Sequence, residues 1–196
     1  MVDNPKRLYL SVALKVMILI GLGFAAVPFV ASITGGEGES SGPQPLGGSL
    51  DVGLADIAPG RTKVVKWFGR DVWIYRRRPE DIAALPQLNT VLRDPGSGQS
   101  RQPDGLRTVY RSAHPEYFVF LPTENIRGCE VSFYPANEPL FADGPWFGGF
   151  AERCYGSRYD LAGRVYRDFG DDSQTNLEVP NHWLISETQL RLGEPR

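Results

Sequence analysis

Two cysteines are the residues most able to do chemistry in this sequence. The chain has 196 residues, among them only two cysteines, Cys129 and Cys154, and two histidines, His114 and His182. Two thiols are too few for a zinc or iron–sulfur site with four cysteine ligands, but in an oxidising compartment they could form a disulfide with each other. Each cysteine has a glycine within two residues, and Cys154 falls within the glycine-rich stretch 146–165. Such tight loops are typical of a metal-cluster site.

The elements that must position these loops are predicted to be mainly β-strands. Sixteen prolines and 22 glycines, with few long apolar runs after the N-terminus, favour short strands joined by turns. Hydrophobic patterning predicts strands at 50–52, 63–68, 71–76, 117–121, 176–180 and 184–192, and a short helix at 79–85. We find no internal repeat. The three arginines at 76–78 could bind an anion, but a solvated strand end or a contact with an acidic partner is the expected role.

The N-terminal region has the pattern of a membrane anchor. Residues 16–33 contain no charge and are long enough to cross most of a bilayer as a helix. Lys6, Arg7 and Lys15 precede this stretch, so the positive-inside rule puts the N-terminus in the cytoplasm and the rest outside it. A cleaved signal peptide is the alternative, and the length of the apolar stretch favours the anchor. Composition then predicts an anchor at 1–33, a Gly/Ser/Pro linker at 34–49 and a domain at 50–196.

The net charge of the chain argues against one class of partner. The formal net charge is −2 at pH 7. A nucleic-acid-binding domain would show a basic face as its first sign, so no nucleic-acid partner is expected.

Three segments together resemble a known family. The hairpin 65–80, the stretch 148–165 with its Gly-Ser-Arg-Tyr-Asp and Ala-Gly-Arg motifs, and Asn-Leu-Glu-Val-Pro at 176–180 are similar to the Rieske iron–sulfur subunit of quinol:cytochrome c reductase. The similarity covers residues 51–193. It implies a mostly β fold: an antiparallel β-sandwich head with a smaller inserted subdomain, carried by one N-terminal transmembrane helix.

The resemblance also implies where the metal ligands should be. Family members bind a two-iron, two-sulfur cluster through two cysteines and two histidines in two short boxes. On this sequence, the cysteine ligands correspond to Glu124 and Glu152, and the histidine ligands to Ile126 and Tyr155. All four ligands are replaced, so no cofactor and no metal are expected. A hard divalent cation bound by Glu124, Glu152 and Tyr155 is the alternative.

Other family features are partly kept. The two cysteines fall on the family's disulfide positions, so the resemblance implies a Cys129–Cys154 bond that closes a loop of about 25 residues and contributes roughly 3 kcal/mol. Ser157 and Tyr159 match residues that donate hydrogen bonds to the cluster sulfurs. The proline-rich loop that covers the cluster is missing, since residues 167–175 contain no proline.

These features lead to an expected function and its alternatives. We expect a non-redox accessory subunit that docks to or stabilises a membrane respiratory complex: a cytochrome bc complex, a cytochrome c oxidase or their supercomplex. The chain itself would not be an enzyme, although its host would be an oxidoreductase. Its expected place is the inner membrane, with the head in the periplasm, and its partners are integral subunits, the lipid bilayer and a soluble cytochrome c. The alternative is an electron-transfer protein of Rieske type with an atypical cluster or another metal. A Rieske-type oxygenase component is a weaker alternative, because no metal triad or nucleophile with a base is visible.

Overall fold

The computed structural model describes residues 9, 12–20, 48–141, 144 and 146–193. It divides into two compact units, Met1–Pro43 and Gln44–Arg196. In the first unit, residues 12–20 are helical and their side chains are exposed. Most of the expected membrane span at 16–33 and of the linker at 34–49 lies outside the described residues. Within the part of the chain that the structure describes, no helix combines the length and the apolar character needed to cross a membrane.

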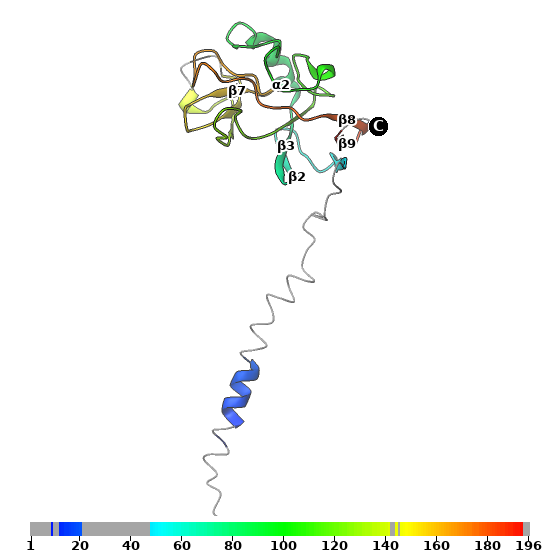
Figure 1. The fold of residues 1–196 in the computed structure, drawn as a ribbon, viewed down its shortest axis with the longest axis vertical. Helices are drawn as coiled ribbons and strands as arrows, with labels where there is room; N and C mark the ends of the chain where they lie inside the picture. The colour runs from blue at the N-terminus through cyan, green and yellow to red at the C-terminus, as the bar shows by residue number, and fades with distance from the viewer. Residues whose placement is uncertain (1–8, 10–11, 21–47, 142–143, 145, 194–196) are drawn as a thin grey trace, which may run out of the picture. The chain divides into compact units, whose positions relative to one another are not determined.

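The second unit, called the head here, is built mainly from antiparallel β-sheets. Its described residues form three three-stranded sheets in the orders β1-β9-β8, β2-β3-β4 and β5-β6-β7. The strands are β1 (Leu50–Gly53), β2 (Thr62–Trp67), β3 (Arg70–Arg76), β4 (Tyr117–Phe120), β5 (Ser132–Tyr134), β6 (Gly149–Ala151), β7 (Arg158–Asp160), β8 (His182–Ser186) and β9 (Gln189–Leu192). The helical segments are α2 (Pro79–Ala84), η1 (Leu85–Leu88), η2 (Asp104–Leu106) and η3 (Pro139–Phe141). In Figure 1, β7 and the β8–β9 pair lie at opposite ends of the head.

The β2-β3-β4 sheet lies between two hydrophobic cores. All four residues of β4 are buried, and they alternate between the cores, because successive side chains of a strand point to opposite faces. Phe118 and Phe120 pack into the core that also contains Phe150 and Tyr159 from the third sheet. Val119 packs into the core shared with β1 and β9. This arrangement confirms the predicted mostly β architecture and explains why the apolar run at 117–121 has no polar residue.

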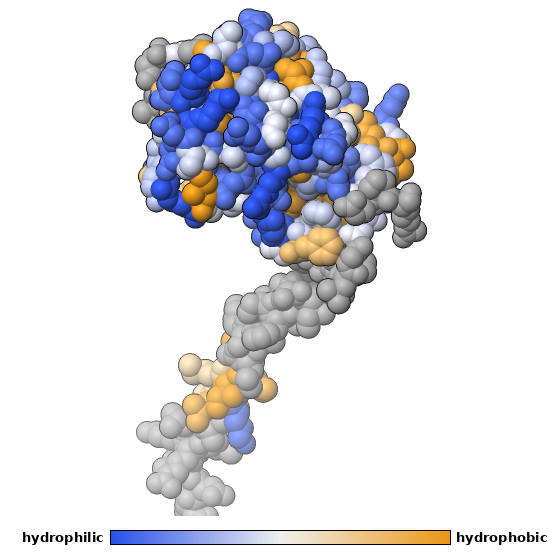
Figure 2. All heavy atoms as spheres, turned by 45° about the horizontal axis from the view of Figure 1, so that its top comes forward, coloured by the Kyte–Doolittle hydropathy of each residue, from blue (hydrophilic) through white to orange (hydrophobic). Residues whose placement is uncertain are grey.

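One face of the head carries only dispersed apolar side chains (Figure 2). The face seen in Figure 2 is mainly hydrophilic, with small apolar patches separated by polar side chains. Val64, Phe68 and Ile185 are among the exposed large apolar residues of the head. The two cores and the smaller cluster around Trp146 and Tyr166 therefore take up most of the large apolar side chains.

The structure confirms most of the predicted elements and corrects two. The hairpin, the short helix and the buried strand are present, whereas residues 176–180 form no strand. The backbone N–H groups of Leu177 and Val179 donate to two unrelated segments, so this stretch is extended but pairs with no single strand. The predicted strand at 184–192 is a hairpin, β8 and β9, which reverses near Thr188.

Buried arginines fix the turn that follows β7. Arg164 forms an ion pair with Asp160 at 2.7 Å, and neither side chain is exposed. Arg77 and Arg111 are also buried, and burial lowers the pKa of each to about 9, so both stay charged at neutral pH. Their guanidinium groups donate to the carbonyl oxygens of Tyr110, Pro115, Leu161, Ala162, Gly163 and Leu177. The expectation of a solvated arginine run at 76–78 is therefore wrong for Arg77, because its charge satisfies backbone carbonyls inside the head.

Candidate functional site

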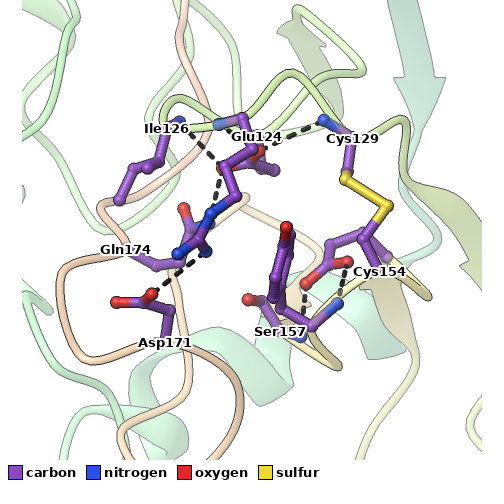
Figure 3. The surroundings of a disulfide bond; sticks show 10 residues. Glu124, Ile126, Cys129, Cys154, Ser157, Asp171 and Gln174 are labelled. Atoms are coloured by element: carbon purple, nitrogen blue, oxygen red, sulfur yellow. Dashed lines mark hydrogen bonds and ion pairs between the residues drawn. A yellow bond between two sulfur atoms is a disulfide. The ribbon is translucent and has the colours of Figure 1, made fainter.

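Two short loops and the disulfide between them form the candidate site. The first loop, residues 124–129, lies between β4 and β5, and the second loop, residues 152–157, connects β6 to β7. Cys129 at the end of the first loop is bonded to Cys154 in the second, as Figure 3 shows. This bond agrees with the pairing that the family resemblance implies.

The two loops have the same backbone pattern. In each, the first residue is a glutamate whose N–H donates to the carbonyl of the sixth residue: Glu124 to Cys129 at 2.9 Å, and Glu152 to Ser157 at 3.1 Å. The fifth residue of each is a glycine with positive φ, 73° at Gly128 and 79° at Gly156, a conformation that favours glycine. In sequence, both loops read Glu-x-x-x-Gly-x.

Glu124 organises the first loop through its carboxylate. The side chain is only 2% exposed. It accepts hydrogen bonds from the backbone N–H groups of Ile126 at 2.8 Å, Arg127 at 2.5 Å and Cys129 at 3.1 Å, and from Gln174 Nε2 at 2.5 Å. Burial alone would raise the pKa of Glu124, but these four donors outweigh burial and lower its pKa below the ordinary value. The carboxylate is thus ionised and has a donor for each of its about four acceptor positions.

Glu152 has the same place in the second loop but fewer partners. It is equally buried, with 2% exposure. Its two oxygens accept hydrogen bonds from the backbone N–H groups of Tyr155 at 2.8 Å and Ser157 at 2.7 Å. Among the described residues these are its two donors, so about half of the acceptor capacity of this carboxylate is unused.

A third segment, residues 167–175, closes over the first loop. Gln174 reaches Glu124, and Asp171 forms an ion pair with Arg127 at 3.0 Å, as seen in Figure 3. Hydrogen bonds from Ser173, and then the bond from Arg127, lower the pKa of Asp171 to about 2. This segment lacks the family's prolines, yet it still covers the site through polar contacts.

The same segment also approaches the second loop closely. Gly170 has a φ of 76°, and a Cβ there would lie 2.2 Å from Ser157 Oγ. The guanidinium of Arg127 lies 3.9 Å from the centre of the Tyr155 ring, which links the two loops a second time. A larger residue at position 170 would therefore separate the third segment from the second loop.

The residues at the four usual ligand positions do not fit the family's cluster. Ile126 and Tyr155, at the histidine positions, are 44% and 49% exposed, and an aliphatic side chain is no metal ligand. Glu124 uses its acceptor positions on its own loop and on Gln174, which also leaves the hard-cation alternative without support. A two-cysteine, two-histidine set is therefore not available at these positions.

The two histidines lie elsewhere in the head. His182 is in β8, where it accepts a hydrogen bond from the N–H of Ala113 at 3.2 Å. Burial lowers its pKa to about 4, so it is neutral and serves the fold. His114 precedes β4, near Tyr117. Neither histidine belongs to the two loops, as the sequence had indicated.

A different set of possible metal ligands lies together at the disulfide. One possible ligand atom from each of Cys129, Glu152 and Cys154 lies within 4.8 Å of the others. Sequence reasoning assigned the cysteines only to a disulfide and Glu152 only to a lost ligand position. The short spacing between Glu152 and Cys154 was the signal that could have joined them.

Comparisons with known proteins identify close relatives of this chain. No protein-family model matches it. It is 35% identical over 195 residues to the ubiquinol–cytochrome c reductase iron–sulfur subunit of Allochromatium vinosum, covering 100% of this chain and 91% of the relative. It is 33% identical over 146 residues to the protein of the same name from Rickettsia conorii, covering 74% of this chain and 71% of that protein.

Further matches are a mitochondrial subunit and a solved structure. The Rieske-1 subunit of the mitochondrial cytochrome b-c1 complex of Nicotiana tabacum is 36% identical over 145 residues, which span 74% of this chain and about half of the relative, 48%. A chain of a hyperthermophilic respiratory Complex III aligns with a TM-score of 0.42 and 15% identity, over 92% of this chain and 98% of that one.

The names of these relatives correct the expected function. They describe iron–sulfur subunits of an oxidoreductase complex, so they contradict the expectation of a non-redox accessory subunit. They favour the alternative, an electron-transfer protein of Rieske type with an atypical cluster or another metal. The expectation was wrong because the loss of the four usual ligands excludes only the two-cysteine, two-histidine ligand set. The fold still brings Cys129, Glu152 and Cys154 together.

Identity across the whole chain, the mostly β head and the paired loops joined by a disulfide all point to one family. The replaced ligands make this chain a degenerate member. The chain belongs to the family of Rieske iron–sulfur subunits of ubiquinol–cytochrome c reductase.

Proposed function

We propose that this chain is a Rieske-type subunit of a ubiquinol–cytochrome c reductase and takes part in its electron transfer with a metal or redox group other than the family's usual cluster. The match to the Allochromatium vinosum iron–sulfur subunit carries the proposal, because it covers the whole of this chain and 91% of that protein. A match confined to the sandwich head would support only a shared scaffold. Once the disulfide is reduced, Cys129, Cys154 and Glu152 offer two thiolates and a carboxylate for such a group.

The proposed organisation has three parts. Residues 1–33 act as the anchor, 34–49 as the linker and 50–196 as the Rieske-like domain, with the head in the periplasm. The basic residues before position 16 and the uncharged stretch after it support this orientation. The partners are then the integral subunits of the reductase and the bilayer, and a cytochrome c that accepts electrons from the complex.

Within this function, the residues of the site hold two loops in fixed positions. Glu124 and Glu152 bind the N–H groups of their own loops, so neither loop needs a metal to keep its backbone conformation. The disulfide and the Arg127–Tyr155 contact join the loops to each other. Together these contacts present Ile126 and Tyr155 at the exposed end of the site, where a partner subunit can approach.

Purification of the native complex tests the proposal. The full-length chain would be tagged in its own cell and extracted in a gentle detergent, followed by identification of the co-purifying subunits, metal analysis and low-temperature EPR. We expect the subunits of a cytochrome b-c1 complex, a transition metal in stoichiometric amount with this chain, and slower ubiquinol–cytochrome c reduction when the chain is deleted. Full reductase activity in the deletion strain, or a chain free of transition metal in an active complex, would refute the proposal.

A further inference from the structure

We propose that reduction of the Cys129–Cys154 disulfide creates a binding site for a single first-row divalent metal ion, with Cys129, Cys154 and Glu152 as its ligands. The site differs from the family's cluster site, because neither cysteine is at a cluster-ligand position. The oxidised chain, in which the two sulfurs bond to each other, cannot form it.

Opening the disulfide would leave three ligand atoms close enough to surround one tetrahedral ion. The two Sγ atoms and a carboxylate oxygen of Glu152 all lie within 4.8 Å of one another. Two thiolates at about 2.3 Å from a tetrahedral metal are separated by about 3.8 Å, and a carboxylate oxygen binds at about 2.0–2.2 Å. One ion can therefore contact all three residues after small side-chain rotations within the existing loops. Thiolate ligands favour iron or zinc over magnesium or calcium.

The hydrogen bonds select Glu152 as the carboxylate ligand. Glu124 has four donors for about four acceptor positions, so it has no lone pair to offer a metal. Glu152 accepts from Tyr155 and Ser157 and keeps about two positions unused within the described part of the head. The two N–H donors would hold its carboxylate in place, as outer-shell hydrogen bonds do for metal ligands in general.

The exposure of the ligands leaves the ion accessible from solvent. Glu152 is buried, Cys129 is partly buried and Cys154 is exposed. Metal ions and reductants can thus reach the sulfurs, and a water molecule can take the fourth coordination position. An open fourth position is typical of reactive rather than purely structural sites.

The steps balance with an external dithiol as the reductant. The dithiol gives two electrons and two protons to the disulfide, so that its own two sulfurs become a disulfide and Cys129 and Cys154 become thiols. The divalent ion then replaces the two thiol protons, which leave to solvent, and Glu152 binds as the third ligand. The metal site can exist whether or not the proposed function is correct. A role for this site in electron transfer rests on the proposed function. In that role the ion would be iron, because zinc has no redox chemistry.

Cobalt titration of the purified full-length chain tests the site. The protein would be reduced with a phosphine, freed of metal and titrated with Co²⁺ under anaerobic conditions. We expect one Co²⁺ per chain with thiolate-to-cobalt charge-transfer absorption, displacement by Zn²⁺ and Fe²⁺, and no such absorption in the oxidised protein.

Matched variants of the two loops identify the ligands. Glu152→Gln should weaken Co²⁺ binding by about 10- to 100-fold, in the range seen when a metal site loses a supporting group. Glu130→Gln changes an exposed glutamate next to Cys129 and should leave the affinity unchanged. The Cys154→Ser variant should lose the charge-transfer absorption, and near-UV circular dichroism would show that each variant stays folded.

Three results would overturn the site: equal Co²⁺ binding by the oxidised and reduced proteins, equal effects of the two glutamate variants, or loss of the folded head on reduction. These results leave the proposed function open, because that function is tested on the native complex by its subunits, metal content and reductase rate. A Co²⁺ site in the isolated chain together with a metal-free active complex would instead refute the proposed function alone.

Discussion

The first and second loops share a sequence pattern and a backbone, yet their buried glutamates have different surroundings. The third segment supplies Gln174 to Glu124 and Asp171 to Arg127, so the first loop is closed by side chains from outside it. The second loop receives backbone donors from its own residues, and the third segment touches it through Gly170 and Ser157. The same backbone conformation can therefore hold a carboxylate whose acceptor positions are all hydrogen-bonded, or one with acceptor positions left to bind a metal.

This difference separates local structure from chemistry. In both loops the hydrogen bond between the N–H of the sixth residue and the glutamate carboxylate keeps the turn closed. Whether the carboxylate can also bind a metal depends on its remaining lone pairs. The number that remains depends on contacts with the third segment, some twenty to fifty residues away in sequence. Three experiments test how far the two loops differ.

Removing the disulfide should have the largest effect on stability. The Cys129→Ser/Cys154→Ser double variant opens a bridge across a sequence separation of 25 residues, which should lower the free energy of unfolding by about 3 kcal/mol by the chain-entropy model. Urea unfolding at neutral pH measures this loss. Because each loop has its own carboxylate, the folded variant should keep the near-UV circular dichroism of the wild type. A collapse of that spectrum would show that the loops depend on each other.

Replacing the two glutamates one at a time compares the loops directly. Glu124→Gln weakens a buried anion with four donors, and we expect a loss of about 2–3 kcal/mol, as for hydrogen bonds to charged groups. Glu152→Gln affects two donors, and about 1 kcal/mol is expected. The two variants are each other's controls in the same urea titration. A larger loss for Glu152→Gln would reverse the comparison.

The pH dependence of stability should identify the charge of Glu124. Its pKa is lowered in the folded head, so between the folded and unfolded pKa values the unfolded chain binds more protons. The carboxylate therefore contributes fully above the unfolded value of about 4.3, and its contribution is lost as the pH falls through the folded pKa. The difference in unfolding free energy between wild type and Glu124→Gln should be constant at neutral pH and shrink in acid. A difference that is independent of pH would mean that charge is not what stabilises the first loop.

The fold could be predicted from the sequence wherever one strand has a clear apolar pattern. The hairpin at β2 and β3 and the buried strand β4 follow from alternation and from the apolar run at 117–121. Residues 176–180 have the same kind of pattern but form no strand, since their N–H groups bond to separate segments. The role of Arg77 was hidden as well, because a charged residue gives no sign in sequence of the buried carbonyls it will meet.

The candidate site could be predicted only in part for a similar reason. The resemblance placed Glu124, Ile126, Glu152 and Tyr155 at the ligand positions and paired Cys129 with Cys154. It could not show which carboxylate has spare acceptor positions, because Gln174 reaches Glu124 across fifty residues of sequence. The inference from replaced ligands to a non-redox role was wrong for this reason. It considered only the residue types at the four ligand positions and not the other possible metal ligands that the fold brings together.

The buried arginines around the turn after β7 also bear on how the head moves. Arg77, Arg111 and Arg164 tie residues 160–164, which follow the second loop and β7 in the chain, to three separate parts of the head. We expect amide hydrogens of this turn to exchange with solvent only when the whole head unfolds, whereas those of the two loops exchange through local opening. The two loops would then open locally while the turn at 160–164 stays fixed. Motion at the disulfide would therefore not disturb the sheets.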